Sequence, residues 1–428
     1  MSKNEAAKGA DEGDRNAMGF LELMKERGML AQVTHEDELG EHLASGVRTA
    51  YAGFDPTADS LHVGHLLPVL ALRRWQKAGH RVIVLLGGGT AMVGDPTGKS
   101  EMRQMADAAV IQQRAERFQK QLSPFLDFSS PEKAIVLNNA DWLLKLEYLP
   151  LLREIGVHFS VNRMLTAECF KQRLEKGLSF LEFNYMILQS YDFYHLNKFH
   201  GCSVQLGGDD QWSNMLGGME LVRRKEQKQA FCFTLPLLVN SEGKKMGKTE
   251  KGAVWIDPDL TSPYDFFQYF RNVDDDMVEK CLFYFSDLPV AEVKALGALR
   301  DKAINEAKVV LAYEATKLVH GAEEAEKAKA MAASLFSGPG GVKPDAPEVF
   351  VDASALPQDP VAIVDLLTLS GIFPSKSEAR RMIEQGGLSL DGEKVTSLQA
   401  TLPLSELRKP DGVLVKKGKK GYHTLKIS

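Results

Sequence analysis

The stretch TAYAGFDPTADSLHVGHLLPVLALRRWQKAGHRVIVLLGG, residues 49–88, decides the fold class. Thr49–Asp55 has strand character, a turn follows at Pro56–Ser60, and the apolar residues after Gly64 recur at helical spacing. Arg81–Gly88 is then a continuous apolar run, typical of a strand buried on both faces of a parallel sheet. A strand, a helix and a strand in about 40 residues form a βαβ unit. The sequence therefore predicts an α/β sheet that binds its ligands beyond the C-terminal ends of its strands.

The rest of the chain extends this plan into several domains. Further strands are expected at Ala134–Ala140, Cys202–Gly208 and Phe231–Leu238. Residues 150–199 have helical character and predict an insertion in the sheet domain, and residues 262–336 are also helical. Five prolines and three glycines between residues 337 and 360 indicate a linker. The expected division is a disordered N-terminus (1–15), a sheet domain with its insertion (16–240), a helical domain (241–336), the linker (337–360) and a small C-terminal domain (361–428).

Composition sets limits on the class of protein. The chain has 428 residues, of which 44% are hydrophobic and 25% charged, which excludes a collagen or a disordered tail. No run reaches the ~18 apolar residues of a spanning helix, and the polar N-terminus is unlike a signal peptide, so no membrane partner is expected. The four cysteines are Cys169, Cys202, Cys232 and Cys281. Because they form no CxxC pair, they indicate a reducing, cytoplasmic location.

The charge is unevenly distributed along the chain. The formal net charge of -5 argues against a nucleic-acid partner when it is averaged over the whole sequence. Residues 361–428, however, hold eleven Lys and Arg against seven Asp and Glu, a net of +4, which leaves -9 for the first 360 residues. A solvated surface is the ordinary explanation for clustered lysines. The alternative is an RNA-binding tail, with the basic residues Lys376, Arg380, Arg381, Lys416, Lys417, Lys419 and Lys420.

The segment HVGH carries the most specific chemical signal. His62 and His65 flank Gly64 where a helix is expected to follow a strand. Two imidazoles three residues apart, together with the amides of a helix N-terminus, form a donor-rich anion site. A metal site or a simple helix cap would also use such a pair, but no third ligand lies at a suitable spacing for a metal.

Two lysine-containing segments are candidates for phosphate binding. KKMGKT, Lys244–Thr249, predicts a mobile cationic loop that can close over a polyphosphate, although a lysine-rich surface loop is a commoner explanation. GDPTGKS, Gly94–Ser100, resembles a P-loop, but Val93 stands where the first glycine would have to be. We therefore reject a P-loop enzyme, while Lys99 and Arg103 remain candidates for phosphate contact.

Polar residues in apolar surroundings complete the candidate site. Tyr185, Gln189 and Asp192 share one face of a predicted helix. That face contains no Lys or Arg and the opposite face is apolar, which favours a pocket wall over a solvated surface. Asp209 and Asp210 follow the Gly207–Gly208 strand end. A carboxylate there can accept hydrogen bonds from ribose hydroxyls, or it can cap the next helix.

The order HVGH, GGDDQW, KMGKT resembles that of the bacterial tyrosyl-tRNA synthetases, a family of class I aminoacyl-tRNA synthetases. The resemblance extends from YAGFDP to the C-terminal SKSEARRMIEQGGLSLDGEKV, which is similar to an S4-type RNA-binding domain. It implies a Rossmann-like α/β catalytic domain with a helical insertion at a homodimer interface, an α-helical domain that binds tRNA, and an S4-like α+β module. It also implies a tyrosine–tRNA ligase whose partners are L-tyrosine, ATP with Mg²⁺ and tRNA(Tyr), without a tightly bound protein-ligated metal.

The same resemblance assigns roles to residues. The tyrosine site would consist of Tyr51 and Asp192 on the phenol hydroxyl, with Asp95, Tyr185, Gln189 and Gln211 around the amino group and ring. Adenosine-binding positions would be Gly53, Asp55, His62, Gly64, His65, Gly208 and Asp210, and the phosphate-binding positions Thr57, Lys99, Arg103, Lys245, Lys248 and Thr249. Catalysis would fall to His62 and His65 with the phosphate-binding set.

Some positions depart from the family pattern. KMGKT has Gly247 where the commoner KMSKS has a serine, and HVGH has Val63 for isoleucine. Ala52 lies where some relatives carry a cysteine.

A tryptophanyl-tRNA synthetase would be an alternative function, since it shares the signatures. However, Tyr51 and Asp192 suit a phenol, and that family lacks the C-terminal module. A non-catalytic RNA-binding protein would require both signatures to be relics.

Overall fold

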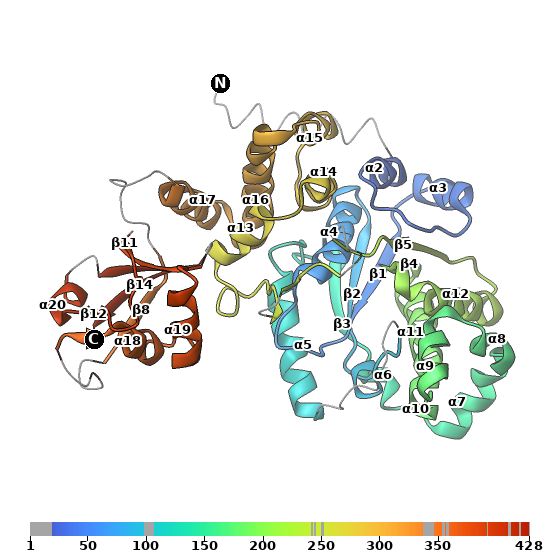
Figure 1. Ribbon diagram of the computed structural model, residues 1–428. Helices are drawn as coiled ribbons and strands as arrows, with labels where there is room; N and C mark the ends of the chain where they lie inside the picture. Colours follow the sequence, from blue (N-terminus) through green and yellow to red (C-terminus); the bar gives the residue numbers. More distant parts are fainter. Residues whose placement is uncertain are drawn as a thin grey trace. The chain divides into compact units, whose positions relative to one another are not determined.

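The computed structural model describes residues 19–97, 107–240, 243, 245–249, 252–336, 346–352, 356, 359–391, 393–409, 412–418 and 421–427 (Figure 1). The predicted disordered N-terminus, 1–15, lies outside these residues. The chain divides into two compact units, Met1–Ala325 and Glu326–Ser428, and each is described by itself. No helix among the described residues is long and apolar enough to cross a membrane.

A five-stranded parallel sheet organises the first unit, and its strands are the five that the sequence predicts. The strands are β1 (Thr49–Phe54), β2 (Arg81–Leu86), β3 (Ala134–Asn138), β4 (Cys202–Gly208) and β5 (Phe231–Leu235), in the order β3-β2-β1-β4-β5. The order reverses between β1 and β4, which pair in parallel. In an open α/β sheet the crevice at this reversal is where ligands bind.

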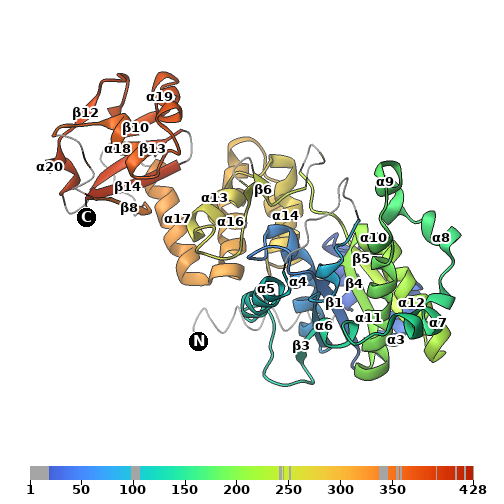
Figure 2. The same cartoon turned by 90° about the horizontal axis from the view of Figure 1, so that it is seen from below.

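Helices pack against the sheet because its apolar strands leave two faces to cover (Figures 1 and 2). α4 (Val63–Lys77) contacts β1 and β2, while α11 (Tyr185–His200) and α12 (Trp212–Glu226) pack on each other and on β4. Tyr51, Ile83, Phe193 and Met215 lie in the resulting core. The remaining helices of the sheet domain are α2 (Phe20–Glu26), α3 (Glu36–Ala44), α5 (Ala108–Leu122), α6 (Ala140–Leu143) and the short helices η1 (Thr90–Met92) and η3 (Asp209–Gln211).

A helical insertion is confirmed between β3 and α11, but the predicted range 150–199 is too long, because α11 lies within it and packs on β4. It consists of α7 (Tyr148–Glu154), η2 (Gly156–His158), α8 (Val161–Leu165), α9 (Glu168–Lys176) and α10 (Phe180–Phe183). Arg173 and Glu182 form a buried ion pair that ties α9 to α10. Several large apolar side chains of this insertion nevertheless face solvent, an unusual feature for a stable surface.

The second helical region, 262–336, is also confirmed. It contains α13 (Pro263–Arg271), η4 (Asp275–Met277), α14 (Val278–Phe285), α15 (Val290–Gly297), η5 (Asp301–Ala303), α16 (Ile304–His320) and α17 (Ala322–Phe336), preceded by the short strands β6 (Lys248–Thr249) and β7 (Gly252–Ala253). Buried Arg27 and Arg74 both donate to the Ser286 carbonyl, and Arg73 and Lys77 pair with Asp287. Because these contacts fix α14 to α4, the predicted boundary at residue 240 is not a break between compact units.

The second unit is an α+β domain with a mixed sheet of order β11-β10-β13-β14-β8. Its strands are β8 (Glu348–Val351), β10 (Leu388–Leu390), β11 (Glu393–Lys394), β13 (Val413–Lys417) and β14 (Gly421–Ile427), beside the pair β9 (Val361–Ala362) and β12 (Thr401–Leu402). Helices α18 (Ile363–Leu369), α19 (Lys376–Glu384) and α20 (Leu404–Leu407) complete it.

Strand β8 corrects the expected extent of the linker. It lies inside the range 337–360 but pairs in parallel with β14, with Val349 opposite Leu425. The prolines around this short strand hide its pattern in the sequence. With residues 346–360 included, the domain carries eleven basic and ten acidic residues, a net of +1 rather than +4. The three acidic residues of this range, Glu348, Asp352 and Asp359, thus nearly balance the positive charge of residues 361–428.

Candidate active site

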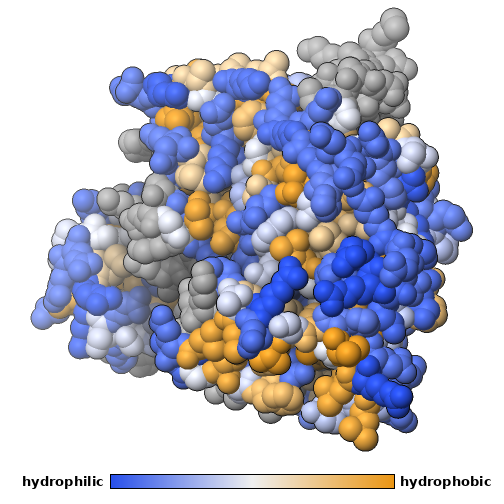
Figure 3. Space-filling model, turned by 90° about the vertical axis from the view of Figure 1, so that its right-hand side faces the viewer, coloured by the Kyte–Doolittle hydropathy of each residue, from blue (hydrophilic) through white to orange (hydrophobic). Residues whose placement is uncertain are grey.

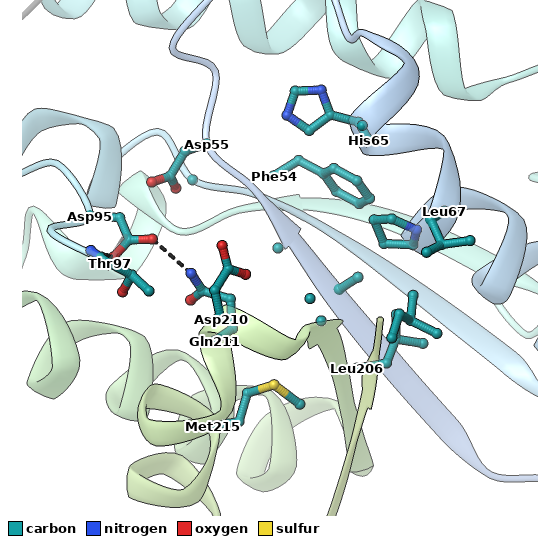
Figure 4. A pocket seen from close by; sticks show the side chains of 18 of the residues that line it. Phe54, Asp55, His65, Leu67, Asp95, Thr97, Leu206, Asp210, Gln211 and Met215 are labelled. Carbon is teal, nitrogen blue, oxygen red and sulfur yellow. Dashed lines mark hydrogen bonds between the residues drawn. The ribbon is translucent and has the colours of Figure 1, made fainter. Parts of the chain in front are cut away.

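A pocket of about 400 Å³ opens at the C-terminal ends of β1 and β4, at the predicted crevice. It collects residues from segments far apart in the sequence (Figure 4). The sequence-predicted residues that line it are Tyr51, Gly53, Asp55, Thr57, His62, Gly64, His65, Asp95, Tyr185, Gln189, Asp192, Gly208, Asp210, Gln211 and Lys245. The structure thus brings together the predicted tyrosine-binding set and the whole predicted adenosine-binding set.

Asp192 lies at the buried end of this pocket, 2% exposed. Asn139 Nδ2 donates to Asp192 Oδ2 over 2.9 Å, and Trp142 Nε1 donates to Asp192 Oδ1 over 2.8 Å. Burial raises the pKa of Asp192 to about 7, although the two donated hydrogen bonds favour the ionised form. Asn139 and Trp142 were missed in the sequence, where only their position just after strand β3 marks them.

Three polar atoms at this end lack partners. Tyr51 Oη, Gln189 Oε1 and Gln205 Oε1 are buried and have no hydrogen-bond partner among the described residues. Gln205, in strand β4, was also missed in the sequence. A buried polar group without a partner costs about 1–3 kcal/mol. The end of the pocket around Asp192 is thus built for a ligand that carries hydrogen-bonding groups.

Asp55 links the end of β1 to two other segments. Tyr185 Oη donates to Asp55 Oδ2 over 3.0 Å, and Thr90 Oγ1 donates to Asp55 Oδ1 over 2.8 Å. A Cβ on Gly87 would lie 1.9 Å from Asp55 Oδ1, so this approach requires glycine after β2. Burial also raises the pKa of Tyr185, which keeps its hydroxyl a donor.

Asp95 and Gln211 point toward each other on one side of the pocket (Figure 4). Gln211 Nε2 donates to Asp95 Oδ2 over 2.7 Å, and the Thr97 amide donates to Asp95 Oδ1 over 2.9 Å. Buried Asn214 donates in turn to Gln211 Oε1 over 3.1 Å. The Asp95 carboxylate is therefore held in place by a hydrogen bond donated to each of its oxygens.

The HVGH segment begins helix α4, as predicted. The Gly64 amide donates to His62 Nδ1 over 3.0 Å, and the His62 amide donates to His65 Nδ1 over 3.1 Å. The capping interpretation is thus correct, and it is compatible with function. A ring that accepts at Nδ1 is neutral and carries its proton at Nε2, so each imidazole becomes an Nε2–H donor.

The predicted lysine loop lies against HVGH. Val63 N donates to the Val254 carbonyl over 3.0 Å, and Val254 N donates to the Gly247 carbonyl over 2.8 Å. Lys245 pairs with Asp210 at 3.3 Å, so the loop reaches the pocket. The backbone of Lys248 and Thr249 forms strand β6.

The two aspartates after β4 have different surroundings. Asp209 Oδ1 accepts from Gln32 Nε2 and Thr234 Oγ1, each over 2.7 Å, which ties the strand end to β5. Asp210 points into the pocket instead (Figure 4). Neither side chain caps the following short helix η3, whose N-cap is Gly208.

The remaining predicted site residues either lie outside the described residues or belong to the second unit. Lys99 and Arg103 lie outside the described residues, as do Lys419 and Lys420 in the second unit. In that unit Lys376 pairs with Asp365, Lys416 lies over the Tyr422 ring, and Lys417 donates to the Ile372 carbonyl. Arg380 and Arg381 lie on α19.

Fold and pocket are those of a class I tRNA synthetase, and residues 45–337 match the family described as tRNA synthetases class I (W and Y). Residues 346–425 match the tyrosine–tRNA ligase SYY-like C-terminal domain. Tyrosine–tRNA ligases of Clostridium botulinum (strain Langeland) and Clostridium kluyveri are each 55% identical to the chain over 406 residues, 95% of the chain and 98% of each relative. The chain therefore belongs to the tyrosine–tRNA ligase family.

Several solved structures share the fold of the chain. A C-terminally truncated mitochondrial tyrosyl-tRNA synthetase of Aspergillus nidulans superposes with a TM-score of 0.67 at 30% identity, covering 78% of the chain and 100% of that protein. The tyrosyl-tRNA synthetase of Archaeoglobus fulgidus, solved with L-tyrosine, has a TM-score of 0.56 at 20% identity, covering 73% and 100%. A tryptophanyl-tRNA synthetase of Encephalitozoon cuniculi shares the fold at 15% identity and a TM-score of 0.54.

Proposed function

We propose how the residues of this pocket divide the work of tyrosine–tRNA ligation. In the first step the carboxylate of tyrosine attacks the α-phosphorus of ATP, pyrophosphate leaves and tyrosyl-adenylate forms. In the second step a ribose hydroxyl of the 3′-terminal adenosine of tRNA(Tyr) attacks the acyl carbon and AMP leaves. The observation that carries the proposal is the buried Asp192, with the unpartnered Tyr51 hydroxyl in the same pocket.

The phenol of tyrosine binds at the Asp192 end. Its hydroxyl donates to the Asp192 carboxylate and accepts a hydrogen bond from the Tyr51 hydroxyl, which removes one of the unsatisfied buried groups. Asp95, with Gln211, Tyr185 and Gln189 nearby, receives the ammonium group. Phenylalanine would leave Tyr51 and Asp192 without the hydroxyl that they bind.

ATP occupies the opposite end, near HVGH. Gly53, Asp55, Gly64, His65, Gly208 and Asp210 contact adenosine, and Thr57, Lys99, Arg103, Lys245, Lys248 and Thr249 contact the phosphates. Because the tyrosine carboxylate is already ionised at neutral pH, the reaction needs no general base. Positioning and stabilisation of phosphate charge are the sources of catalysis, supplied by Nε2–H donors of His62 and His65 and by the lysine loop.

Mg²⁺ is proposed to enter with ATP, bound by its phosphate oxygens. Magnesium commonly binds in this way and keeps several waters. Among the described residues, no three His, Cys, Asp or Glu side chains form a cluster suited to a metal.

The tRNA partner is proposed to contact the second unit. The basic residues on α19 and on the β13–β14 hairpin supply phosphate contacts of the kind expected in an S4-like domain. A reducing, cytoplasmic location is proposed from the cysteines, all four of which are free and buried.

A homodimer is proposed from the apolar face of the insertion (Figure 3). Tyr148, Leu149, Val157, Val161 and Phe180 are each more than half exposed, and a second copy of the chain would cover them. Leu149→Lys with Val157→Lys should convert the dimer to a monomer of 47.3 kDa in light scattering. Val47→Lys, at an equally exposed apolar residue outside the insertion, is the matched control. A double variant that keeps the dimer mass would refute this interface.

Amino-acid-dependent pyrophosphate exchange tests the function itself. We expect tyrosine to stimulate exchange and tryptophan and phenylalanine to do so far less. Stimulation by tryptophan alone would contradict the assignment of the phenol site. A purely RNA-binding protein would show no exchange with any amino acid.

A further inference from the structure

The middle of the lysine loop is tightly confined on one side by helix α4. Gly247 has φ +82°, a conformation that favours glycine, and it is buried. A Cβ at this position would lie 3.1 Å from the Gly64 amide nitrogen and 3.2 Å from Val63 Cβ. The backbone of one signature segment therefore rests directly on the other.

A tyrosine of the helical region holds the same glycine by its amide. Tyr269, on α13, accepts a hydrogen bond from the Gly247 N–H at its Oη over 2.8 Å. The Tyr269 ring packs edge-on against buried Phe270, with centroids 5.2 Å apart, and α13 packs on α16. Burial raises the pKa of Tyr269 to about 12, so the phenol remains protonated at neutral pH. The acceptor is thus set on a packed helix, outside the loop it contacts.

This contact fixes the centre of the loop and leaves its lysines on either side. Lys245 precedes Gly247 by two residues and already reaches Asp210, while Lys248 follows directly. Because a positioning error of about 1 Å at a reacting centre is costly, an anchor at Gly247 controls how well the lysines meet the phosphates.

We propose that Tyr269 is a positioning residue for adenylate formation, whose hydroxyl holds the Gly247 amide and thereby sets the lysine loop over the phosphates of ATP. The proposal rests on the proposed function of that loop. It links the helical region to the activation chemistry through a single hydroxyl group.

Tyr269→Phe tests the proposal by removing one oxygen and keeping the ring. A hydrogen bond of this kind contributes about 0.5–1.5 kcal/mol, so the rate of tyrosyl-adenylate formation should fall roughly 2- to 12-fold, with a higher KM for ATP. The dissociation constant of tyrosine should stay unchanged. Trypsin should also cleave after the loop lysines faster in the variant without ATP, a readout independent of activity.

Tyr284→Phe is the matched control, because it removes another hydroxyl that bonds to backbone, the Gly28 carbonyl at 3.0 Å, away from the loop. It should leave the KM for ATP and the loop cleavage rate unchanged. Equal effects of the two variants, or a Tyr269→Phe enzyme with unchanged ATP kinetics and loop cleavage, would overturn the proposal.

Lys245→Ala separates this inference from the proposed function. If that variant uses ATP normally, the phosphate role assigned to Lys245 is wrong, and the cleavage comparison still decides whether Tyr269 anchors the loop. If Lys245→Ala loses activation while Tyr269→Phe keeps it, only the inference about Tyr269 fails.

Discussion

Asp192 combines burial with two fixed donors, and this combination makes tyrosine recognition dependent on pH. Burial raises the pKa of Asp192 from 3.8 to about 7. Below that pH the Asp192 carboxyl group of the enzyme without tyrosine is mostly protonated. The tyrosine phenol donates a stronger hydrogen bond to the ionised carboxylate than to the protonated acid, which offers a weaker acceptor and a competing donor. We therefore expect kcat/KM for tyrosine to fall up to tenfold for each pH unit below about 7.

Asp192→Asn tests this dependence. The variant should lose the pH step and weaken tyrosine activation roughly 10- to 150-fold, the range of a hydrogen bond to a charged group, with little effect on ATP binding. Pyrophosphate exchange between pH about 5.5 and 8 measures both effects. Equal losses in tyrosine and ATP binding would mean that Asp192 is structural.

The same shift affects stability in a defined direction. Between pH about 4 and 7 the folded chain keeps a proton on Asp192 that the unfolded chain has lost. The contribution of Asp192 to the free energy of unfolding is thus largest below pH about 4 and decreases as pH rises to about 7. A shallower pH dependence of unfolding should follow in Asp192→Asn.

Residue spacing predicted part of this site but not all of it. Tyr185, Gln189 and Asp192 share a helix, so their common face follows from helical periodicity alone. Asn139 and Trp142 reach Asp192 across about 50 positions of sequence. Only the arrangement of β3 beside the pocket brings them there, and no local pattern contains that information.

At the scale of elements, the N-terminus of α4 joins a structural cap to a functional group. A Cβ on Gly64 would lie 2.8 Å from His62 Cε1 and 3.0 Å from its Nδ1. Gly64→Ala should displace the ring and lose the cap, at a cost of about 1 kcal/mol in the free energy of unfolding. Urea denaturation measures that cost.

Activation should suffer more than stability in Gly64→Ala, because the Nε2–H donor of His62 moves with its ring. We expect the rate of adenylate formation to fall by at least tenfold, the effect of losing one aimed donor. Gly40→Ala, in a helix with open space around the glycine, is the control. If Gly64→Ala lowers the free energy of unfolding but forms adenylate at the normal rate, the His62 cap has no part in catalysis.

The elements themselves were largely predictable, for a physical reason. The five strands of the parallel sheet are apolar runs bounded by turns, and the buried sheet requires that pattern. β8 was missed because a four-residue strand between prolines has too little pattern to distinguish it from a linker. Its identity depends on pairing with β14 at the far end of the domain.

At the scale of the whole molecule, the corrected boundary changes where the chain should be cut. Removing residues 361–428 would leave β8 without its partner β14, and an unpaired strand promotes aggregation. Removal of residues 346–428 deletes the sheet completely. We expect the chain without residues 346–428 to form tyrosyl-adenylate normally but to charge tRNA poorly. The charging defect should increase as the salt concentration rises.

Filter-based charging assays at two or more salt concentrations measure this loss, with pyrophosphate exchange as the internal control. Lys416→Ala with Arg380→Ala in the full chain should reproduce part of the defect without removing the domain. Normal charging by the shortened chain at physiological salt would show that the second unit is not needed to hold tRNA.

The position of β14 also has a consequence for synthesis on the ribosome. β1 to β5 are complete once residue 235 has left the exit tunnel, so the catalytic sheet can assemble while translation continues. In the C-terminal sheet, β14 is the last strand in the sequence, and it lies between β13 and β8. Strand β8, the first of this sheet to be synthesised, therefore stays unpaired until residues 421–427 of β14 emerge. A messenger RNA truncated shortly before the codons of β14 yields a catalytic unit attached to a C-terminal domain whose sheet is incomplete.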